Sequence, residues 1–184
     1  SKILIFGDSI SAAYGIQRED GWVELLRKEL SKSAATWEVI NASMSGETSA
    51  GGIARLPNML EEYNPKIVVI ELGGNDALRG YPIASIQDNL TNMSEIAKNS
   101  GCIVLLVEMR IPPNYGIRYT NAFAKIFANV AHSTDIRLVP FILEDVALDR
   151  TLMQDDGIHP SAKAQPILLN AIWPILKKAI ADSS

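Results

Sequence analysis

"KILIFGDSIS" (residues 2–11) is an apolar, strand-like run followed at once by glycine, aspartate and serine. Further apolar runs of similar length recur along the chain, and segments with helical periodicity lie between them. Strands that are apolar on both faces must be covered on both faces. The alternation therefore predicts a parallel sheet between two layers of helices.

The bounds of these segments follow from where the apolar pattern starts and stops. The predicted strands are Lys2–Phe6, Glu38–Asn41, Lys66–Leu72, Cys102–Met109 and Arg137–Pro140. The predicted helices are Trp22–Leu30, Ala50–Tyr63, Ile83–Asn99, Arg118–Ala131 and Ser161–Ile180. With right-handed crossovers, they predict a single three-layer α/β/α domain over 1–184, with about five parallel strands in flavodoxin-like order.

The composition excludes several classes of protein. Of 184 residues, 47% are hydrophobic and 21% are charged, and the net charge of −4 argues against a nucleic-acid-binding surface. No apolar run approaches the ~18 residues of a membrane span, so we expect no membrane insertion. One cysteine and two histidines cannot supply an internal disulfide or a Cys- or His-rich metal site, and no metal is expected.

Polar loops follow the predicted strands. In open parallel sheets, ligands bind beyond the carboxyl ends of the strands. Those ends carry the sequences GDSIS, NASMSGETSAGG, GGND and MRIPPNYG, and a fifth polar segment, MQDDGIHPSA, precedes the last helix. We therefore expect these five segments to converge on one crevice.

Ser9 can be a turn residue or a nucleophile, and a nucleophilic serine needs a neighbouring base. His132 lies near the end of a helical pattern and is expected on the surface. His159 lies in the turn DGIHP, with Asp156 three residues before it, a spacing that can bring the carboxylate beside the imidazole. Taken alone, DGIHP is more often a helix-entry turn than a catalytic pair.

Acyl transfer also needs donors for an oxyanion. Asn75 in GGND offers an amide at the same sheet edge, and Gly46 in SMSGET can expose its backbone N–H. Singly, Asn75 is better read as a cap or turn residue and Gly46 as a residue of positive φ. Asp8 is expected to brace the turn at Ser9, Asp155 to face solvent, and Glu71 to brace a loop without a chemical role.

Taken together, the blocks FGDSIS, NASMSGETSAGG, ELGGNDALRG and DDGIHP resemble those of the SGNH hydrolases, also called the GDSL-like esterase superfamily. ELGGNDALRG, RIPPNYGIRY and MQDDGIHP are especially similar to the bacterial multifunctional thioesterase, protease and lysophospholipase group, which includes arylesterases. The first block reads GDSI where the family name implies GDSL, a small apolar change. The resemblance implies Ser9 as nucleophile, His159 as base and Asp156 as its partner. It also implies an oxyanion hole from Ser9, Gly46 and Asn75, and no cofactor.

The resemblance further implies acyl ester and thioester substrates, including lysophospholipids and aryl esters. Loops 77–80 and 111–119 are expected to frame an acyl crevice. The substrate-binding residues proposed from these loops are Ala77, Leu78, Ile111, Pro112 and Tyr115. The chain begins Ser1-Lys2 without methionine, as a mature form after signal-peptide removal or a trimmed chain would. With the resemblance, this favours a periplasmic or secreted monomer.

Three alternatives remain at this point. Ser49 could be the nucleophile, since ETSAG is close to the GxSxG elbow of α/β-hydrolases, but Glu47 stands where glycine is required and several residues separate it from the strand. A non-catalytic module could bind small ligands in the same crevice, which would leave Asp156 and His159 unexplained. An acetyl-ester carbohydrate deacetylase could use the same scaffold.

Overall fold

The sheet has the predicted parallel arrangement in the computed structural model, which describes residues 1–32 and 36–183. Within these residues, its strands are β1 (Lys2–Gly7), β2 (Glu38–Asn41), β3 (Ile67–Glu71), β4 (Ile103–Val107) and β5 (Arg137–Val139). They are ordered β2-β1-β3-β4-β5, and every neighbouring pair is parallel. The flavodoxin-like order and all five strand positions are confirmed, with ends that differ from the prediction by at most two residues.

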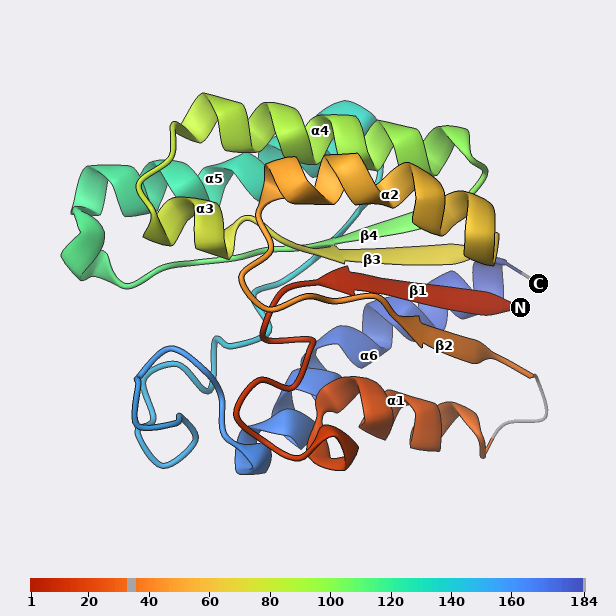
Figure 1. Cartoon of the computed structure of the whole chain (residues 1–184), viewed down its shortest axis with the longest axis horizontal. Helices are drawn as coiled ribbons and strands as arrows, with labels where there is room; N and C mark the ends of the chain where they lie inside the picture. The colour runs from red at the N-terminus through yellow and green to blue at the C-terminus, as the bar shows by residue number, and fades with distance from the viewer. Residues whose placement is uncertain (33–35, 184) are drawn as a thin grey trace.

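Two layers of helices enclose the sheet. The α-helices are α1 (Trp22–Leu30), α2 (Ser49–Tyr63), α3 (Gly74–Leu78), α4 (Ile83–Asn99), α5 (Ile117–Thr134) and α6 (Gln165–Asp182). Helices α2, α3, α4 and α5 lie on one side of the sheet, and α1 and α6 lie on the other (Figure 1). Short 3₁₀ turns at Arg18–Asp20, Pro113–Tyr115 and Ala162–Ala164 precede α1, α5 and α6.

Two helices differ from their predicted form. The last predicted helix starts as the 3₁₀ turn Ala162–Ala164 and becomes α-helical at Gln165. Helix α3 was predicted as a turn or loop, because five residues are too few to display helical periodicity. Helix α3 matters for the site, since it begins at Gly74, the second glycine of GGND, and contains Asn75.

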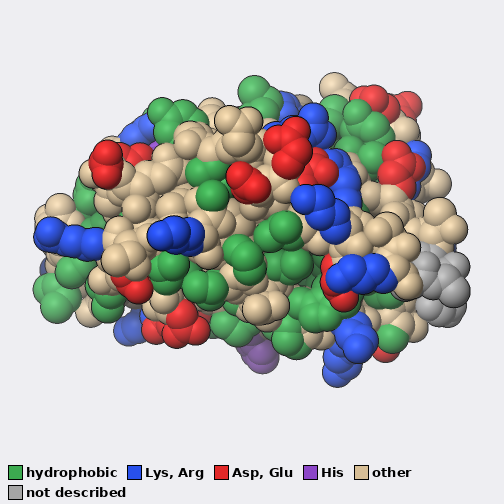
Figure 2. Space-filling view, turned by 90° about the horizontal axis from the view of Figure 1, so that it is seen from below, with side chains coloured by type: hydrophobic (Ala, Val, Ile, Leu, Met, Phe, Trp, Pro, Cys, Tyr) green, Lys and Arg blue, Asp and Glu red, His purple; other side chains and the backbone are tan. Residues whose placement is uncertain are grey.

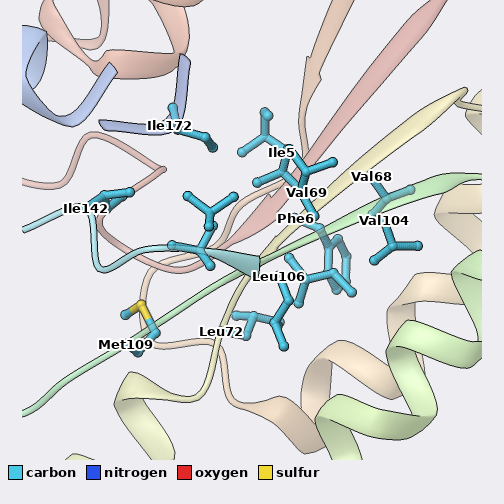
Figure 3. Packing of buried hydrophobic residues seen from close by; sticks show 14 of the residues in the cluster. Ile5, Phe6, Val68, Val69, Leu72, Val104, Leu106, Met109, Ile142 and Ile172 are labelled. Carbon is cyan, nitrogen blue, oxygen red and sulfur yellow. The ribbon is translucent and has the colours of Figure 1, made fainter. Parts of the chain in front are cut away.

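The two faces of the sheet bury different sets of side chains. In-register neighbours share a face, so Phe6, Val68 and Val104 point one way and Ile5 and Val69 point the other. Figure 3 shows Ile5 and Val69 on the side of Ile172 from α6, with Phe6, Leu72 and Leu106 toward the opposite helices. Full burial of each of these large apolar side chains contributes about 1.5–3 kcal/mol to the free energy of unfolding.

The strand order fixes where chemistry can occur. All five strands run in one direction, so their carboxyl ends lie together, at the left of Figure 1, and the polar loops gather there. In the part of the chain that is described, no helix has both the length and the hydrophobicity needed to cross a membrane.

Candidate active site

Ser9 stands in a tight turn directly after β1. The Asp8 carboxylate accepts a hydrogen bond from the Ile10 backbone N–H at 3.0 Å, and the Ala12 N–H donates to the Asp8 carbonyl at 3.0 Å. The expectation that Asp8 braces this turn is confirmed. The turn leaves Ser9 half-buried at the sheet edge, while the Asp8 side chain is only 3% exposed.

His159 and Asp156 meet Ser9 from the far end of the chain. His159 Nε2 lies 2.9 Å from Ser9 Oγ, and His159 Nδ1 lies 2.5 Å from Asp156 Oδ2. The other oxygen of Asp156 accepts hydrogen bonds from the backbone N–H groups of Ile158 (2.9 Å) and His159 (3.0 Å). The turn therefore fixes the carboxylate, and the carboxylate fixes the imidazole in the tautomer whose Nε2 faces the serine.

Asp156 remains ionised although its surroundings partly desolvate it. Desolvation opposes the charged form, but the hydrogen bonds from the His159 ring and from two backbone N–H groups outweigh it and lower the pKa of Asp156 to about 2. The carboxylate therefore carries a full negative charge beside the imidazole at neutral pH. It can stabilise an imidazolium when His159 takes a proton.

The predicted oxyanion donors lie on three neighbouring segments. Neither the Ser9 N–H nor the Gly46 N–H has an acceptor among the described residues. Gly46 is exposed and adopts φ +79°, a conformation that disfavours any side chain. Asn75 Nδ2 lies 2.9 Å from the Glu47 carbonyl and 3.4 Å from Asp8 Oδ2. Gly46 does not line the cavity described below. It is linked to Asn75 through the next residue, Glu47, whose carbonyl accepts the hydrogen bond from the Asn75 amide.

Ser49 is placed elsewhere. It is completely buried at the first turn of α2, where its hydroxyl donates to Asp76 Oδ1 at 2.6 Å and its backbone N–H donates to Asp76 Oδ2 at 2.9 Å. The Asn89 amide also donates to its oxygen at 2.9 Å. These contacts pin α2 to α3 and α4, so Ser49 has a structural role and its hydroxyl is not presented to a substrate. His132 and Asp155 are exposed, as predicted.

A cavity of about 590 Å³ opens beside Ser9, Asn75 and His159. Four of the residues predicted to bind substrate line it: Leu78, Ile111, Pro112 and Tyr115. The prediction for Ala77 is wrong, because this side chain is fully buried in the core on the inner side of α3. Successive helical residues point about 100° apart, which separates Ala77 from Leu78.

Much of the cavity wall was missed by the sequence reasoning. The additional apolar lining residues are Ile10, Met109, Phe141, Leu143, Ala147, Leu148, Met153 and Ile158. Most belong to the turn-rich segment between β5 and the His159 turn, whose leucines and alanines show no regular period. The sequence signal that could have identified them is their position after the last strand, at the same sheet edge as the other loops.

A second carboxyl group lies beneath the Ser9 turn. Glu71 is completely buried at the end of β3, and its Oε2 accepts hydrogen bonds from Ser11 Oγ at 2.6 Å and from the Asp8 N–H at 3.4 Å. Burial, with the nearby Asp8 carboxyl, raises the pKa of Glu71 well above its ordinary value. Burial also raises the pKa of Asp8 to about 6. Glu71 does brace a loop, as predicted, and it does so as a buried acid.

The described residues hold no cluster of three or more His, Cys, Asp or Glu side chains suited to a metal ion. On the face shown in Figure 2, Lys and Arg side chains are interspersed with Asp and Glu side chains and form no basic patch.

Known proteins are similar to this chain over most of its length. The model of the GDSL-like lipase/acylhydrolase family matches residues 5–166. Esterase TesA of Pseudomonas aeruginosa is 51% identical over 175 residues, 95% of this chain and 87% of that protein. Thioesterase 1/protease 1/lysophospholipase L1 of Escherichia coli is 42% identical over 166 residues, 90% and 78% of the two chains. The crystal structure of the psychrotrophic esterase EstA from Pseudoalteromonas, inhibited by monoethylphosphonate, matches with a TM-score of 0.93 and 43% identity over 98% of each chain.

Proposed function

The chain belongs to the GDSL-like lipase/acylhydrolase family and is a serine esterase, and we propose that Ser9, His159 and Asp156 are its catalytic triad. The observation that carries this proposal is the continuous pair of contacts, 2.9 Å from Ser9 Oγ to His159 Nε2 and 2.5 Å from His159 Nδ1 to Asp156. In a non-catalytic binding module, nothing would require these three groups to be aligned.

In the first half of the reaction, Ser9 Oγ attacks the acyl carbonyl while His159 Nε2 takes the hydroxyl proton. The ionised Asp156 stabilises the imidazolium that forms. When the tetrahedral intermediate collapses, Nε2 returns the proton to the leaving alcohol or thiol, which departs from an acyl-Ser9 ester. A water molecule, deprotonated by the same nitrogen, then attacks the acyl-enzyme; the bond between the acyl carbon and Ser9 Oγ breaks, Nε2 returns the proton to Oγ, and the carboxylic acid is released.

The developing oxyanion is stabilised by the backbone N–H groups of Ser9 and Gly46 and by the Asn75 amide. The two backbone donors have no acceptor among the residues that the structure describes, so they break no internal hydrogen bond when the oxyanion forms. The Glu47 carbonyl holds the Asn75 amide by the shorter of its two hydrogen bonds, 2.9 Å, and the oxyanion takes the place of the longer one, 3.4 Å to Asp8 Oδ2. The chemistry needs no cofactor.

The substrates are esters and thioesters of acyl chains longer than acetyl, including aryl esters and lysophospholipids. The cavity beside Ser9 is lined by apolar side chains, such as Ile111, Leu143 and Met153, and its volume of about 590 Å³ exceeds what an acetyl group fills. This observation favours an acyl esterase over a carbohydrate deacetylase.

The test has two arms. A fluorophosphonate should label wild type and Ser49→Ala but not Ser9→Ala, and Ser9→Ala should lose ester hydrolysis while its circular dichroism stays unchanged. In the second arm, kcat/KM is measured on p-nitrophenyl esters from acetyl to dodecanoyl and on matching acyl-CoAs, and it should rise beyond acetyl. Labelling at Ser49, or a maximum at acetyl, would contradict the proposal.

We also propose that residues 1–184 act as one hydrolase domain, as a monomer, in the periplasm or outside the cell. Light scattering on a gel-filtration column tests the monomer, limited proteolysis tests the single domain, and fractionation of the source cells tests the location. A dimer mass, a stable proteolytic fragment or a cytoplasmic fraction would each overturn the corresponding statement.

A further inference from the structure

Tyr14 lies against the imidazole of His159. The two ring centroids are 4.5 Å apart and the ring planes meet at 39°. Tyr14 is 52% exposed, so its position is not explained by core packing. Its hydroxyl has no hydrogen-bond partner in the described part of the chain. The contact therefore depends on the ring alone.

Gln154 ties the loop of Tyr14 to the loop of His159. Its side-chain Nε2 donates to the Tyr14 carbonyl at 2.8 Å and to the Pro160 carbonyl at 2.9 Å. Its backbone N–H donates to the His159 carbonyl at 2.8 Å. One residue thus bridges two segments that are about 140 positions apart in the chain.

The backbone beside Tyr14 is bent to make this contact. Ala13 adopts φ +59° and Gly15 adopts φ +75°. The left-handed conformation costs a residue such as alanine free energy, and such strain persists only where the surroundings enforce it. A Cβ on Gly15 would lie 2.1 Å from Gln154 Oε1, so a side chain at this position would displace the bridging amide.

We propose that Tyr14 is a positioning residue for His159, held in place by Gln154. The Tyr14 ring keeps the imidazole in the orientation that faces both Ser9 and Asp156, and it shields the hydrogen bond between Nδ1 and Asp156 from water. When His159 is protonated during the reaction, the π-face of the ring also favours the cation. The inference rests on the proposed triad.

Four variants separate this role from a general structural role. Tyr14→Phe keeps the ring and should retain wild-type kcat on p-nitrophenyl butyrate. Tyr14→Ala should lower kcat roughly 2–10-fold, with KM unchanged because Tyr14 does not line the acyl cavity. Gln154→Ala should lower kcat in the same way, by a smaller factor. Tyr81→Ala removes another half-exposed tyrosine and should change nothing.

A readout that does not depend on hydrolysis is the downfield ¹H NMR resonance of the His159 Nδ1–H. It should be sharp in wild type and Tyr14→Phe and broadened by exchange with water in Tyr14→Ala, all with unchanged circular dichroism. If wild type hydrolysed no ester, the proposed function would fail while this resonance still tested the shielding. The inference itself is overturned by a Tyr14→Ala variant with wild-type kcat and a sharp resonance. It is equally overturned if Tyr14→Phe is as impaired as Tyr14→Ala, or if only KM changes.

Discussion

Carboxyl groups approach Ser9 from two sides, and they are built in opposite ways. Beneath the turn, Glu71 is 0% and Asp8 is 3% exposed, and burial raises the pKa of both. Beside the turn, the Asp156 side chain is 39% exposed, and hydrogen bonds that outweigh its desolvation lower its pKa to about 2. The same functional group is thus driven toward its neutral form in one region and toward its ionised form in the other.

The difference separates two tasks. The buried pair accepts hydrogen bonds from Ser11, Ile10 and the backbone of the turn, so it shapes the loop that presents the nucleophile. The exposed carboxylate has a histidine as partner, and in the proposed mechanism it stabilises the positive charge that this histidine gains during proton transfer. We therefore expect substitutions beside Ser9 to act on kcat, and substitutions beneath it to act mainly on stability.

The largest effect should follow from removing the base. His159→Ala should lower kcat by a factor on the order of 10⁶, as the loss of a triad histidine does elsewhere, while the melting temperature changes little. The matched control is His132→Ala, which removes an exposed histidine on α5 and should be nearly silent. Steady-state kinetics with p-nitrophenyl butyrate measure both. An inactive His132→Ala with an active His159→Ala would reverse the assignment.

The next largest loss of kcat should follow from replacing Asp156, the carboxylate beside His159. Asp156→Asn should lower kcat by about 10⁴, because the amide stabilises the wrong imidazole tautomer. Asp155→Asn changes a neighbouring exposed aspartate and should leave kcat unchanged.

The lowered pKa of Asp156 also makes stability depend on pH. Its contribution to the free energy of unfolding is present above the ordinary pKa of 3.8 and is lost as pH falls toward about 2. Acid unfolding of wild type and Asp156→Asn should therefore converge at low pH, and parallel curves would argue against this linkage.

Asn75 connects the two regions, since its amide lies near Asp8 and faces the cavity at Ser9. Asn75→Ala should lower kcat by about 10²–10³ with KM little changed, because the donor serves charge that exists only in the transition state. Asn75→Asp should do no better, since a carboxylate repels the oxyanion. Asn121→Ala, an exposed position on α5, is the control. A destabilised Asn75→Ala that keeps wild-type kcat per folded molecule would reduce Asn75 to a turn residue.

The smallest effect on activity is expected beneath the turn. The raised pKa of Glu71 means that its contribution to folding is fully present below its ordinary pKa of 4.5 and is lost as pH rises through the folded value. Over that window wild type loses about 1.4 kcal/mol of unfolding free energy per pH unit relative to Glu71→Gln. Urea unfolding from pH 5 to pH 9 measures the difference, with exposed Glu61→Gln as control. Identical pH profiles for Glu71→Gln and wild type would mean that Glu71 is ionised in the folded protein.

The sequence predicted the elements that carry a regular pattern. All five strands and the long helices were found because apolar runs of four to eight residues and helical periods of 3.6 are visible without tertiary information. Ser9, Asp156 and His159 were singled out because each falls in a polar block at a strand end or before the last helix, and their roles as a triad were predicted from the resemblance of those blocks to the SGNH hydrolases. The structure brings these three side chains into contact.

What escaped prediction depends on tertiary geometry. Ala77 was assigned to the cavity because it is near Asn75 in sequence, and only the phase of the short helix α3 shows that it points into the core. The cavity wall at Phe141 and Leu148 lies in a segment without a regular element. The burial of Glu71 could not be predicted from the sequence, because a charged residue at the end of a strand is usually exposed to solvent.

The hydrogen bond between Ser9 and His159 joins residues 150 positions apart. Esterase activity can therefore appear only after both of these distant segments have folded. Closing so long a loop costs chain entropy, and parallel sheets assemble through non-local contacts that form slowly. The first strand and the turn before the last helix must both have docked before the nucleophile has its base. During refolding from urea, helical circular dichroism should therefore recover before esterase activity, and the regain of activity marks the final closure of the molecule.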